Sequence, residues 1–395
     1  MAKKLRIDWF MFAIAAGLAL FGSVMVYSAS AMISLKETAN NPDGPTQFQY
    51  FFKQVGFTVV GLIVMYIASK VDYRIFNNKL IVYGLVGITI LLLVVVLGFP
   101  AINGARRWIR VPGFSLQPSE IAKVVLPIFL AYFLTKNEKT VGEVKETVLP
   151  CLLILGAMGG LIMLEPDLGT TIVLCAIFVA VYFAAGAKIL HIALVGAILL
   201  LFGLGALILA PWRMARLMAF LNPWENADGS AYQVVQGLYA IGSGGIIGEG
   251  FAKGQQKLFY LPYPYSDFIF AVVGEELGLI GTLAVVVAFG LLLWRGTRAA
   301  LLAPDRFGML LGIGIITGLI VQALFNISVV ISILPAKGIP LPFISYGGSS
   351  ILVTLGAVGI LLNISQYAGF VSIGNKKEET EERPKRRRRG KLGLK

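Results

Sequence analysis

The sequence is short of charge: only 14% of its 395 side chains are Asp, Glu, Lys or Arg, whereas 57% are hydrophobic. Soluble domains average roughly 25% charged residues, so this chain cannot cover a water-facing surface. It also lacks the alternating segments of about ten residues that build membrane β-barrels. Apolar runs of about 20 residues recur instead, each long enough to cross a bilayer as a helix. The sequence predicts an all-α, polytopic membrane protein.

Cysteine and histidine are nearly absent. Cys151 and Cys175 lie inside apolar runs, where we interpret them as small packing residues without partners for a disulfide or metal framework. His191, the single histidine, disfavours a histidine-based metal site. No cleavable signal peptide is evident, so the first apolar stretch is interpreted as a membrane span.

Ten apolar segments are candidate membrane helices, and the placement of Lys and Arg gives their orientation. The basic residues favour a cytoplasmic N-terminus and a cytoplasmic C-terminus, although the C-terminal tail supplies much of the bias. The predicted spans are residues 9–31, 51–69, 80–100, 118–135, 147–164, 168–186, 190–210, 267–294, 308–331 and 349–367.

One connection is much longer than the others. Residues 211–266 join the seventh and eighth spans on the predicted outer face, and eight glycines fall between Gly229 and Gly254. A structureless loop of this length is uncommon unless it forms a lid or a binding element. We predict a folded, partly re-entrant cap over an outer cavity, with Arg213 and Arg216 on one face of a short interfacial helix.

The chain ends in a basic tail. Residues 376–395 carry ten basic and four acidic side chains, which supply nearly half of the net charge of +13. We interpret residues 1–368 as one membrane domain and 369–395 as a disordered cytoplasmic tail that anchors the topology. Membrane lipids are its expected partners, at about 1 kcal/mol per basic residue, and no nucleic-acid partner is predicted.

Charged side chains near membrane spans are costly and therefore mark function by default. In "NGARRWIRVPGFSLQPSEIAKVV", Arg106 and Arg107 lie in a predicted outer loop, and guanidinium groups bind phosphate bidentately. Glu120 and Lys123 are three residues apart and share a helix face. They form either a structural ion pair or part of a cation-lined cavity for an anionic substrate, and the sequence leaves both open.

The stretch "EPDLGTT" predicts a tight outer turn, in which Glu165 ends one span and Asp167 opens the next. An acid at a helix N-terminus is stabilised by the helix dipole, so capping alone explains Asp167. A direct functional role is the alternative for this pair of acids.

"LPYPYSDFIFAVVGEELG" places Asp267 at the mouth of an apolar run. We predict that Ser266 caps a helix and that Asp267 lies in its first turn, either as a second capping acid or as a general base. Crowding by aromatic residues would desolvate the carboxylate and raise its pKa into the general-base range. Glu275 lies about 12 Å further along the axis, so both acids are predicted to line one cavity, while Glu276 pairs with a neighbouring helix.

Two further segments supply polar candidates. Gln256 and Lys257 lie in "QQKLFYLP", just before Asp267, and Lys337 and Ser345 lie in "ILPAKGIPLPFISYGGSS". The second segment holds three prolines and three glycines, so it cannot form an ordinary span. We predict a broken or re-entrant element that faces protein or a wet cavity.

Together these motifs resemble one known family. "LNPWE", "YQVVQ", "AIGSGG", "GEGF", "QKLFYLP", "DFIFAVVGEELG" and "LPAKGIPLPFISYGGSS", in this order, are similar to the SEDS family (shape, elongation, division and sporulation). "GARRWI", "QPSEIAK" and "EPDLGT" fit it too, so the resemblance covers residues 9–368. "LNPW", "QKLFYLP" and "SYGGSS" are more similar to the FtsW branch, with its sporulation relative, than to the RodA branch.

The resemblance implies a ten-span fold that polymerises lipid II into β-1,4-linked glycan strands at the outer face of the bacterial cytoplasmic membrane. It implies division as the process, the septum as the place and Asp267 as the catalytic aspartate. The family usually has a glutamate and a threonine where this chain has Tyr263 and Ser266. If that glutamate assists substrate binding in the family, another residue must supply this assistance in the present chain.

We expect Asp267 to take the proton from the acceptor's 4-hydroxyl, whose oxygen attacks the donor's anomeric carbon and releases undecaprenyl diphosphate. Positive charge would stabilise this leaving group, and a divalent cation (Mg²⁺ or Mn²⁺) could assist, although spacing reveals no paired-carboxylate ligand set. The expected substrate-binding residues are Arg106, Arg107, Glu120, Lys123, Glu165, Asp167, Gln256, Lys257, Glu275, Lys337 and Ser345.

Other functions stay open: an elongation or sporulation polymerase, a lipid-II flippase, or a non-catalytic scaffold. The family usually acts with a class B penicillin-binding protein. This chain has no "SxxK" with "KTG" for peptide cross-linking, so a separate transpeptidase and other division membrane proteins are the expected partners.

Overall fold

The structure, a computed structural model, describes residues 6–40, 48–102, 104–111, 114–208, 211–229, 231–258 and 260–367. The predicted tail, residues 369–395, lies outside this part of the chain. The described residues are mostly helical, as predicted. Their one sheet is a small antiparallel pair, β1 (Ile109–Val111) and β2 (Phe114–Leu116), in the connection that leads to α4.

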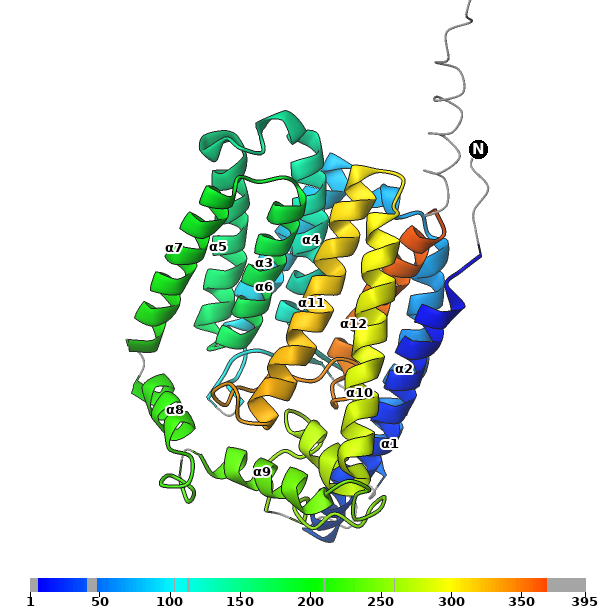
Figure 1. Ribbon diagram of the computed structural model, residues 1–395, viewed down its shortest axis with the longest axis vertical. Helices are drawn as coiled ribbons and strands as arrows, with labels where there is room; N and C mark the ends of the chain where they lie inside the picture. Colours follow the sequence, from blue (N-terminus) through cyan, green and yellow to red (C-terminus); the bar gives the residue numbers. More distant parts are fainter. Residues whose placement is uncertain are drawn as a thin grey trace, which may run out of the picture.

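The long helices lie side by side along the long axis of the molecule, and α8 and α9 lie at one end of it (Figure 1). The helix bounds are α1 (Trp9–Asn40), α2 (Gln49–Lys70), α3 (Lys79–Val96), α4 (Pro118–Lys136), α5 (Leu149–Leu164), α6 (Leu168–Ala184), α7 (Ile189–Ile208), α8 (Pro211–Leu221), α9 (Tyr232–Gly244), α10 (Ile269–Leu301), α11 (Arg306–Val330) and α12 (Gly348–Ser365).

Eight helices in the described part of the chain are long and apolar enough to cross a membrane. They are α1 to α5 and α10 to α12, so the protein is a multi-pass membrane protein. Helix α6 is apolar but has only 17 residues, and α7 occupies the position of the remaining predicted segment. The predicted bounds were most wrong at the end of α1, which reaches Asn40, and at the end of α10, which reaches Leu301.

The cap between α7 and α10 contains the predicted interfacial helix, α8, and a second helix, α9. Ala219 of α8 packs against Ala231 and Val235. The cap lies at one end of the molecule, whereas α1 begins and α12 ends at the opposite end (Figure 1).

Helix α10 is not one continuous helix, which the sequence did not predict. Gly278 has φ of 64° and ψ of −159°, a conformation that favours glycine and interrupts the helical hydrogen bonds. The cap replaces them: Leu279 N donates to Gly245 O at 2.9 Å, and Ile280 N donates to Ile246 O at 3.2 Å. The first turns of α10 are thereby fixed to the cap.

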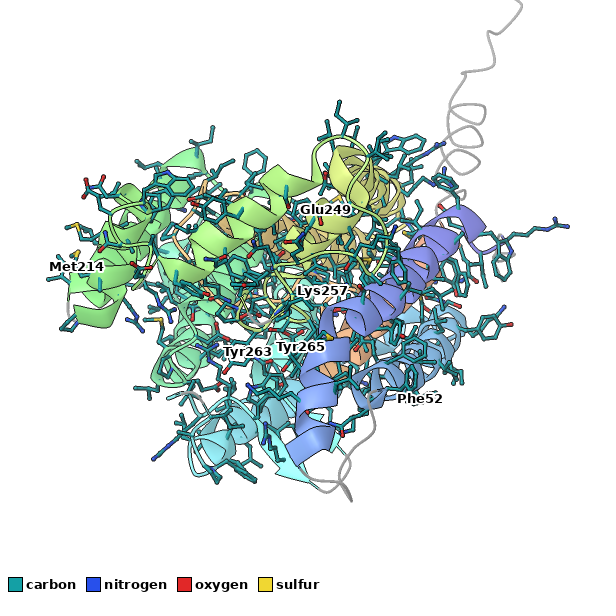
Figure 2. All side chains as sticks on the ribbon, turned by 90° about the horizontal axis from the view of Figure 1, so that it is seen from below. Phe52, Met214, Glu249, Lys257, Tyr263 and Tyr265 are labelled. Atoms are coloured by element: carbon teal, nitrogen blue, oxygen red, sulfur yellow. The ribbon has the colours of Figure 1, made fainter. Side chains whose placement is uncertain are left out.

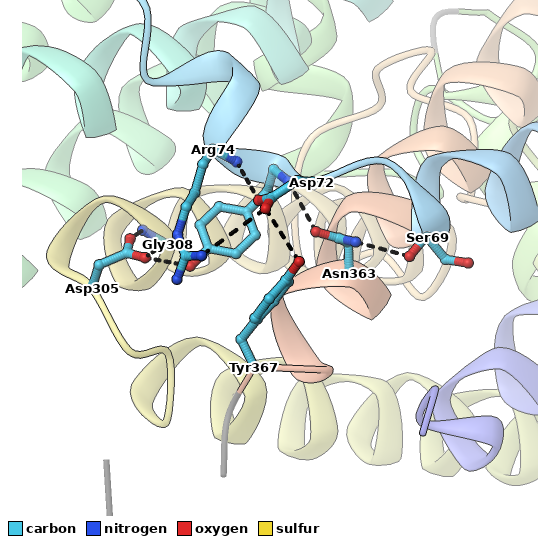
Figure 3. Close-up of polar contacts among 8 residues, drawn as sticks. Ser69, Asp72, Arg74, Asp305, Gly308, Asn363 and Tyr367 are labelled. Carbon is cyan, nitrogen blue, oxygen red and sulfur yellow. Dashed lines mark hydrogen bonds and ion pairs between the residues drawn. The ribbon is translucent and has the colours of Figure 1, made fainter. Parts of the chain in front are cut away.

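A polar cluster joins several elements at the end opposite the cap (Figure 3). Asp305 caps α11 by accepting from Gly308 N at 2.7 Å, and it accepts from Arg74 Nε at 3.1 Å. Asn363 of α12 accepts from Tyr73 N at 2.9 Å. These bonds join the turn that follows α2 to the start of α11 and the end of α12.

Candidate active site

A cavity of about 410 Å³ lies at the capped end, between the turn before α10, the segment that joins α11 to α12, the residues just before β1 and just after β2, and the cap. This volume is in the usual range for small-molecule sites, roughly 300–1,000 Å³. Figure 2 views the molecule from this end and places Tyr263, Tyr265 and Lys257 near its middle, with Met214 of α8 towards the edge. The polar and charged lining residues are Arg107, Trp108, Gln117, Arg216, Gln233, Tyr263, Ser266, Asp267, Lys337, Tyr346 and Ser350.

Asp267 lies in a turn before α10 and not in its first helical turn, which corrects the prediction. Phe268 is the N-cap position, and Ser266 makes no cap: its hydroxyl donates to Tyr263 O at 3.5 Å. The turn is instead held by Asn326 of α11, whose Nδ2 donates to Asp267 O at 2.8 Å and to Ile339 O at 2.7 Å. Sequence reasoning missed Asn326, although a polar residue in an apolar span was the available signal.

The segment between α11 and α12 is irregular, as predicted, and it supports the same turn. Ser345 Oγ donates to Ser266 O at 2.6 Å, and Tyr346 N donates to Tyr265 O at 2.9 Å. Ser345 is thus a positioning residue and does not line the cavity itself. Lys337, from the same segment, does line it, as expected of a cation near the substrate.

The carboxylate of Asp267 is desolvated in a positively charged setting. Its pKa is raised to about 6 in all: burial is the largest cause, Asp167 adds to the increase, and Arg107 and Arg216 oppose it. A group with a pKa near the working pH is well suited to general-base catalysis. Burial is thus the main cause of the raised pKa of Asp267, as the sequence argument assumed when it placed aromatic residues around the carboxylate.

A reaction in which Asp267 is the base is expected to follow a bell-shaped pH profile. Asp267 must be deprotonated to accept a proton, so activity should rise with pH through about 6. Burial, with Arg213 and Arg216 nearby, lowers the pKa of Lys337 to about 8, so a required positive charge would be lost above that pH. Initial rates from pH 5 to 9 measure both limbs, and Lys337→Arg should remove only the alkaline limb. A flat profile would contradict both assignments.

Gly338 lies directly against the catalytic candidate. A Cβ at this position would come within 2.5 Å of Asp267 Oδ2, so the glycine allows the carboxylate to reach the cavity. We expect Gly338→Ala to lower activity by about 10²-fold, because displacement of a reacting group by about 1 Å has this cost. Gly290→Ala in α10, which meets open space, is the control and should be near neutral. Equal rates for the two variants would show that Asp267 is not confined here.

Arg107 joins the α5–α6 turn to the cavity. Its Nε donates to Glu165 O at 3.0 Å, and its Nη2 donates to Pro166 O. Asp167 caps α6, accepting from Thr170 N at 3.1 Å, which confirms the capping interpretation. The side chain of Glu165 is fully buried, which raises its pKa to about 9, and Glu165 does not line the cavity with Asp267. Neither of its carboxyl oxygens has a hydrogen-bond partner among the described residues.

Two of the expected substrate-binding groups form a structural ion pair instead. Lys123 Nζ lies 2.7 Å from Glu120 Oε1, and it also donates to Gln322 of α11. Neither lines the cavity with Asp267. Arg106 is exposed and donates to Leu97 O at 2.9 Å, also away from the cavity. Of the two alternatives for Glu120 and Lys123, the ion pair is therefore the one observed.

The prediction that Asp267 and Glu275 share a cavity is wrong. Glu275 is 1% exposed, and its Oε1 accepts from Gln255 N at 2.6 Å and Gln256 N at 2.9 Å, because the cap folds back over α10. Gln256 thus contributes its backbone to this contact and does not line the cavity.

The prediction that Glu276 pairs with a neighbouring helix is confirmed, with one addition. Ser28 of α1 donates to Glu276 Oε1 at 2.6 Å, and Lys257 Nζ lies 2.5 Å from the same oxygen. Lys257 is 5% exposed and is therefore a structural partner of Glu276 rather than a cation of the cavity.

The described residues contain no group of three or more His, Cys, Asp or Glu side chains placed to hold a metal ion. Cys151 and Cys175 are free. Apart from Asp267, the charged residues that line the cavity are cations, and Arg216, which the sequence placed only on an interfacial helix, is one of them.

Relatives of this chain are similar over most of its length. It is 40% identical to the stage V sporulation protein E of Bacillus subtilis (strain 168) over 371 residues, 93% of this chain and 99% of that protein. It is 41% identical to the probable peptidoglycan glycosyltransferase FtsW of Geobacter metallireducens over 362 residues, 91% of this chain and 95% of that protein. The predicted resemblance to the FtsW branch and its sporulation relative is confirmed.

Solved structures share the fold. The crystal structure of the rod shape determining protein RodA of Thermus thermophilus has a TM-score of 0.66 and 28% identity, covering 92% of this chain and 97% of that one. A chain from a peptidoglycan synthase complex that coordinates polymerization and crosslinking has a TM-score of 0.72 and 28% identity, covering 93% and 99%. Residues 8–369 match the family model described as cell cycle protein, which groups FtsW, RodA and SpoVE. The chain belongs to this FtsW/RodA/SpoVE family.

Proposed function

We propose that Asp267 is the general base with which this protein, a peptidoglycan glycosyltransferase, polymerises lipid II. The observation that carries the proposal is the position of Asp267 in a cavity of about 410 Å³ lined by Arg107, Arg216 and Lys337. A base beside three cations suits a reaction in which a sugar hydroxyl loses a proton and a diphosphate leaves. The names of the curated relatives support the same activity.

The reaction needs one base and a positive field. Asp267 takes the proton of the acceptor's GlcNAc 4-hydroxyl as that oxygen forms a bond to the anomeric carbon of the donor's MurNAc. The bond from this carbon to the diphosphate breaks, and undecaprenyl diphosphate leaves with the electron pair. Inversion of the α-linked donor yields a β-1,4 linkage. The diphosphate is a good leaving group when its charge is neutralised, so no second carboxylate is required as an acid.

The membrane arrangement follows from the substrate. We propose ten spans, with α6 and α7 completing the eight longer helices, and both termini in the cytoplasm. The cap and the cavity then face outward, where the polyprenyl chain of lipid II stays in the bilayer while its sugars reach Asp267. The start of α1 and the end of α12 both lie opposite the cap, which supports this orientation (Figure 1).

The cellular setting is proposed from the relatives. A class B transpeptidase is the expected partner, since one similar structure is of a complex that coordinates polymerization and crosslinking. The septum is the proposed location, because several relatives are named FtsW. Spore formation is the second setting, since a relative of almost equal identity is a sporulation protein.

Purified full-length protein with its transpeptidase partner, given lipid II in the absence of other enzymes, tests the activity. Polymeric glycan and released undecaprenyl diphosphate are the expected products, and both should disappear in Asp267→Asn. A flippase would instead move fluorescent lipid II between leaflets and tolerate Asp267→Asn. A scaffold would give neither product nor movement.

A further inference from the structure

Helix α11 presents two buried amides to the segment that joins it to α12. Gln322 and Asn326 are four residues apart, so they lie on the same face of the helix, and they are 3% and 2% exposed. Gln322 Nε2 donates to Pro340 O at 2.8 Å. Asn326 Nδ2 donates to Ile339 O at 2.7 Å. The two amides thus bind consecutive carbonyls, directly after Gly338.

Asn326 also reaches the turn that carries the proposed base. Its Nδ2 donates a second hydrogen bond, of 2.8 Å, to Asp267 O. An amide nitrogen has two hydrogens, and here each bonds to a different segment of the chain. Its Oδ1 has no partner among the described residues, so the two donor bonds alone set the direction of the amide. One side chain therefore fixes the backbone of Asp267 relative to that of Ile339.

The segment held by the two amides forms part of the wall around the carboxylate. Gly338 and Pro340 both line the cavity, and a Cβ on Gly338 would come within 2.5 Å of Asp267 Oδ2. Pro340 has no N–H, so its carbonyl is its one backbone group for hydrogen bonding. A shift of this segment would therefore change the room available to the Asp267 carboxylate.

The direction of the Gln322 amide is fixed from α4. The ammonium group of Lys123 can only donate, and it donates to Gln322 Oε1, so Nε2 must face Pro340 O. Lys123 is itself held by Glu120 Oε1 at 2.7 Å. The ion pair of α4, which does not line the cavity, is therefore connected to the cavity wall through Gln322.

We propose that Gln322 and Asn326 are positioning residues, which hold residues 338–340 against the turn before α10 and so keep the Asp267 carboxylate aligned with the acceptor hydroxyl. This inference rests on the proposed glycosyltransferase function and deepens it. Neither amide lines the cavity, so both act through the backbone that they bind and not on the substrate. Their loss should lower kcat and leave KM nearly unchanged.

Two variants test the proposal on purified full-length protein with its transpeptidase partner and fluorescent lipid II, with rates scaled to the folded fraction. Asn326→Asp preserves the size of the side chain but can donate to at most one of the two carbonyls, even when it is protonated. We expect its kcat to fall about 10²-fold and its KM to change less than about twofold. Gln322→Met, which keeps the chain length and removes one hydrogen bond, should lower kcat about tenfold.

A buried amide at the opposite end of the molecule is the matched control. Asn363 is 0% exposed, accepts from Tyr73 N at 2.9 Å and donates to Ser69 O at 2.9 Å (Figure 3). Asn363→Asp should therefore lose thermal stability, as Asn326→Asp does, and keep the kcat of the wild type. The comparison separates a positioning role from a general loss of stability.

Equal kcat values for Asn326→Asp and Asn363→Asp would overturn the proposal, and so would a raised KM with an intact kcat. If Asn326→Asp does not fold, Gln322→Met decides, and a wild-type kcat would then reject the positioning role. Gly338→Ala combined with Gln322→Met should lose less than the product of the two single losses, because both displace one segment. Losses that multiply would reject this shared route. Failure of the glycosyltransferase function has a different signature, namely polymer from Asp267→Asn at the wild-type rate.

Discussion

Asp267→Asn is expected to abolish glycan polymerisation, with a loss of at least about 10²–10⁴-fold, the usual contribution of a positioned general base. Asparagine preserves the size of the side chain but cannot take a proton from a sugar hydroxyl. The turn itself should survive, because Asn326 and Ser345 hold backbone carbonyls and not the carboxylate. The measurement is the initial rate of polymer formation from fluorescent lipid II, separated by gel electrophoresis.

A matched control separates the loss of a base from the loss of a charge in the cap. Asp228→Asn removes an exposed acid of the same cap, outside the cavity, and should retain the activity of the wild type. Asp267→Glu tests geometry, because it keeps a base but moves it by about one methylene. Polymer from Asp267→Asn at the rate of the wild type would remove the base assignment and leave a binding role at most.

The fold could be predicted from the sequence because each membrane helix is a long apolar run. The bilayer fixes the length of such runs, so all ten predicted segments are helical even where the bounds differ. The break at Gly278 could not be predicted, because a glycine in an apolar run also fits a continuous helix. What makes the break stable is pairing with Gly245 and Ile246, which is a tertiary contact.

The candidate site could be predicted only in part. Asp267, Arg107 and Lys337 were found because charges beside membrane spans are rare, and the structure brings all three to one cavity. Glu275 was misassigned because the sequence argument projected one straight helix from residue 267. Helix α10 begins two residues later, and the cap folds back over its inner turns. Lys257 was misassigned because closeness to Asp267 in the sequence does not show that it pairs with Glu276 instead. Arg216 was missed because its neighbours come from distant elements.

The buried pair of Lys257 and Glu276 gives the largest expected effect on stability. Lys257→Met leaves Glu276, which is 0% exposed, as a buried charge without its cation. Removing one partner of such a pair costs about 3–5 kcal/mol, whereas replacing both costs far less. We therefore expect a clear loss of thermal stability in Lys257→Met and substantial recovery in Lys257→Met with Glu276→Gln. The measurement is the thermal unfolding of the wild type, of Lys257→Met and of the double variant, each purified in the same detergent.

The same substitution should also lower activity, because the pair joins the cap to the first turns of α10 and to Ser28 of α1. These turns follow directly on Asp267, so loosening them moves the base. Lys253→Met, an exposed lysine of the same loop, controls for the loss of charge and should unfold like the wild type. If the Lys257→Met protein unfolds at the same temperature as the control and the double variant unfolds no higher, the pair contributes nothing to stability. The cap must then be held by its other contacts with α10, among them those of Glu275.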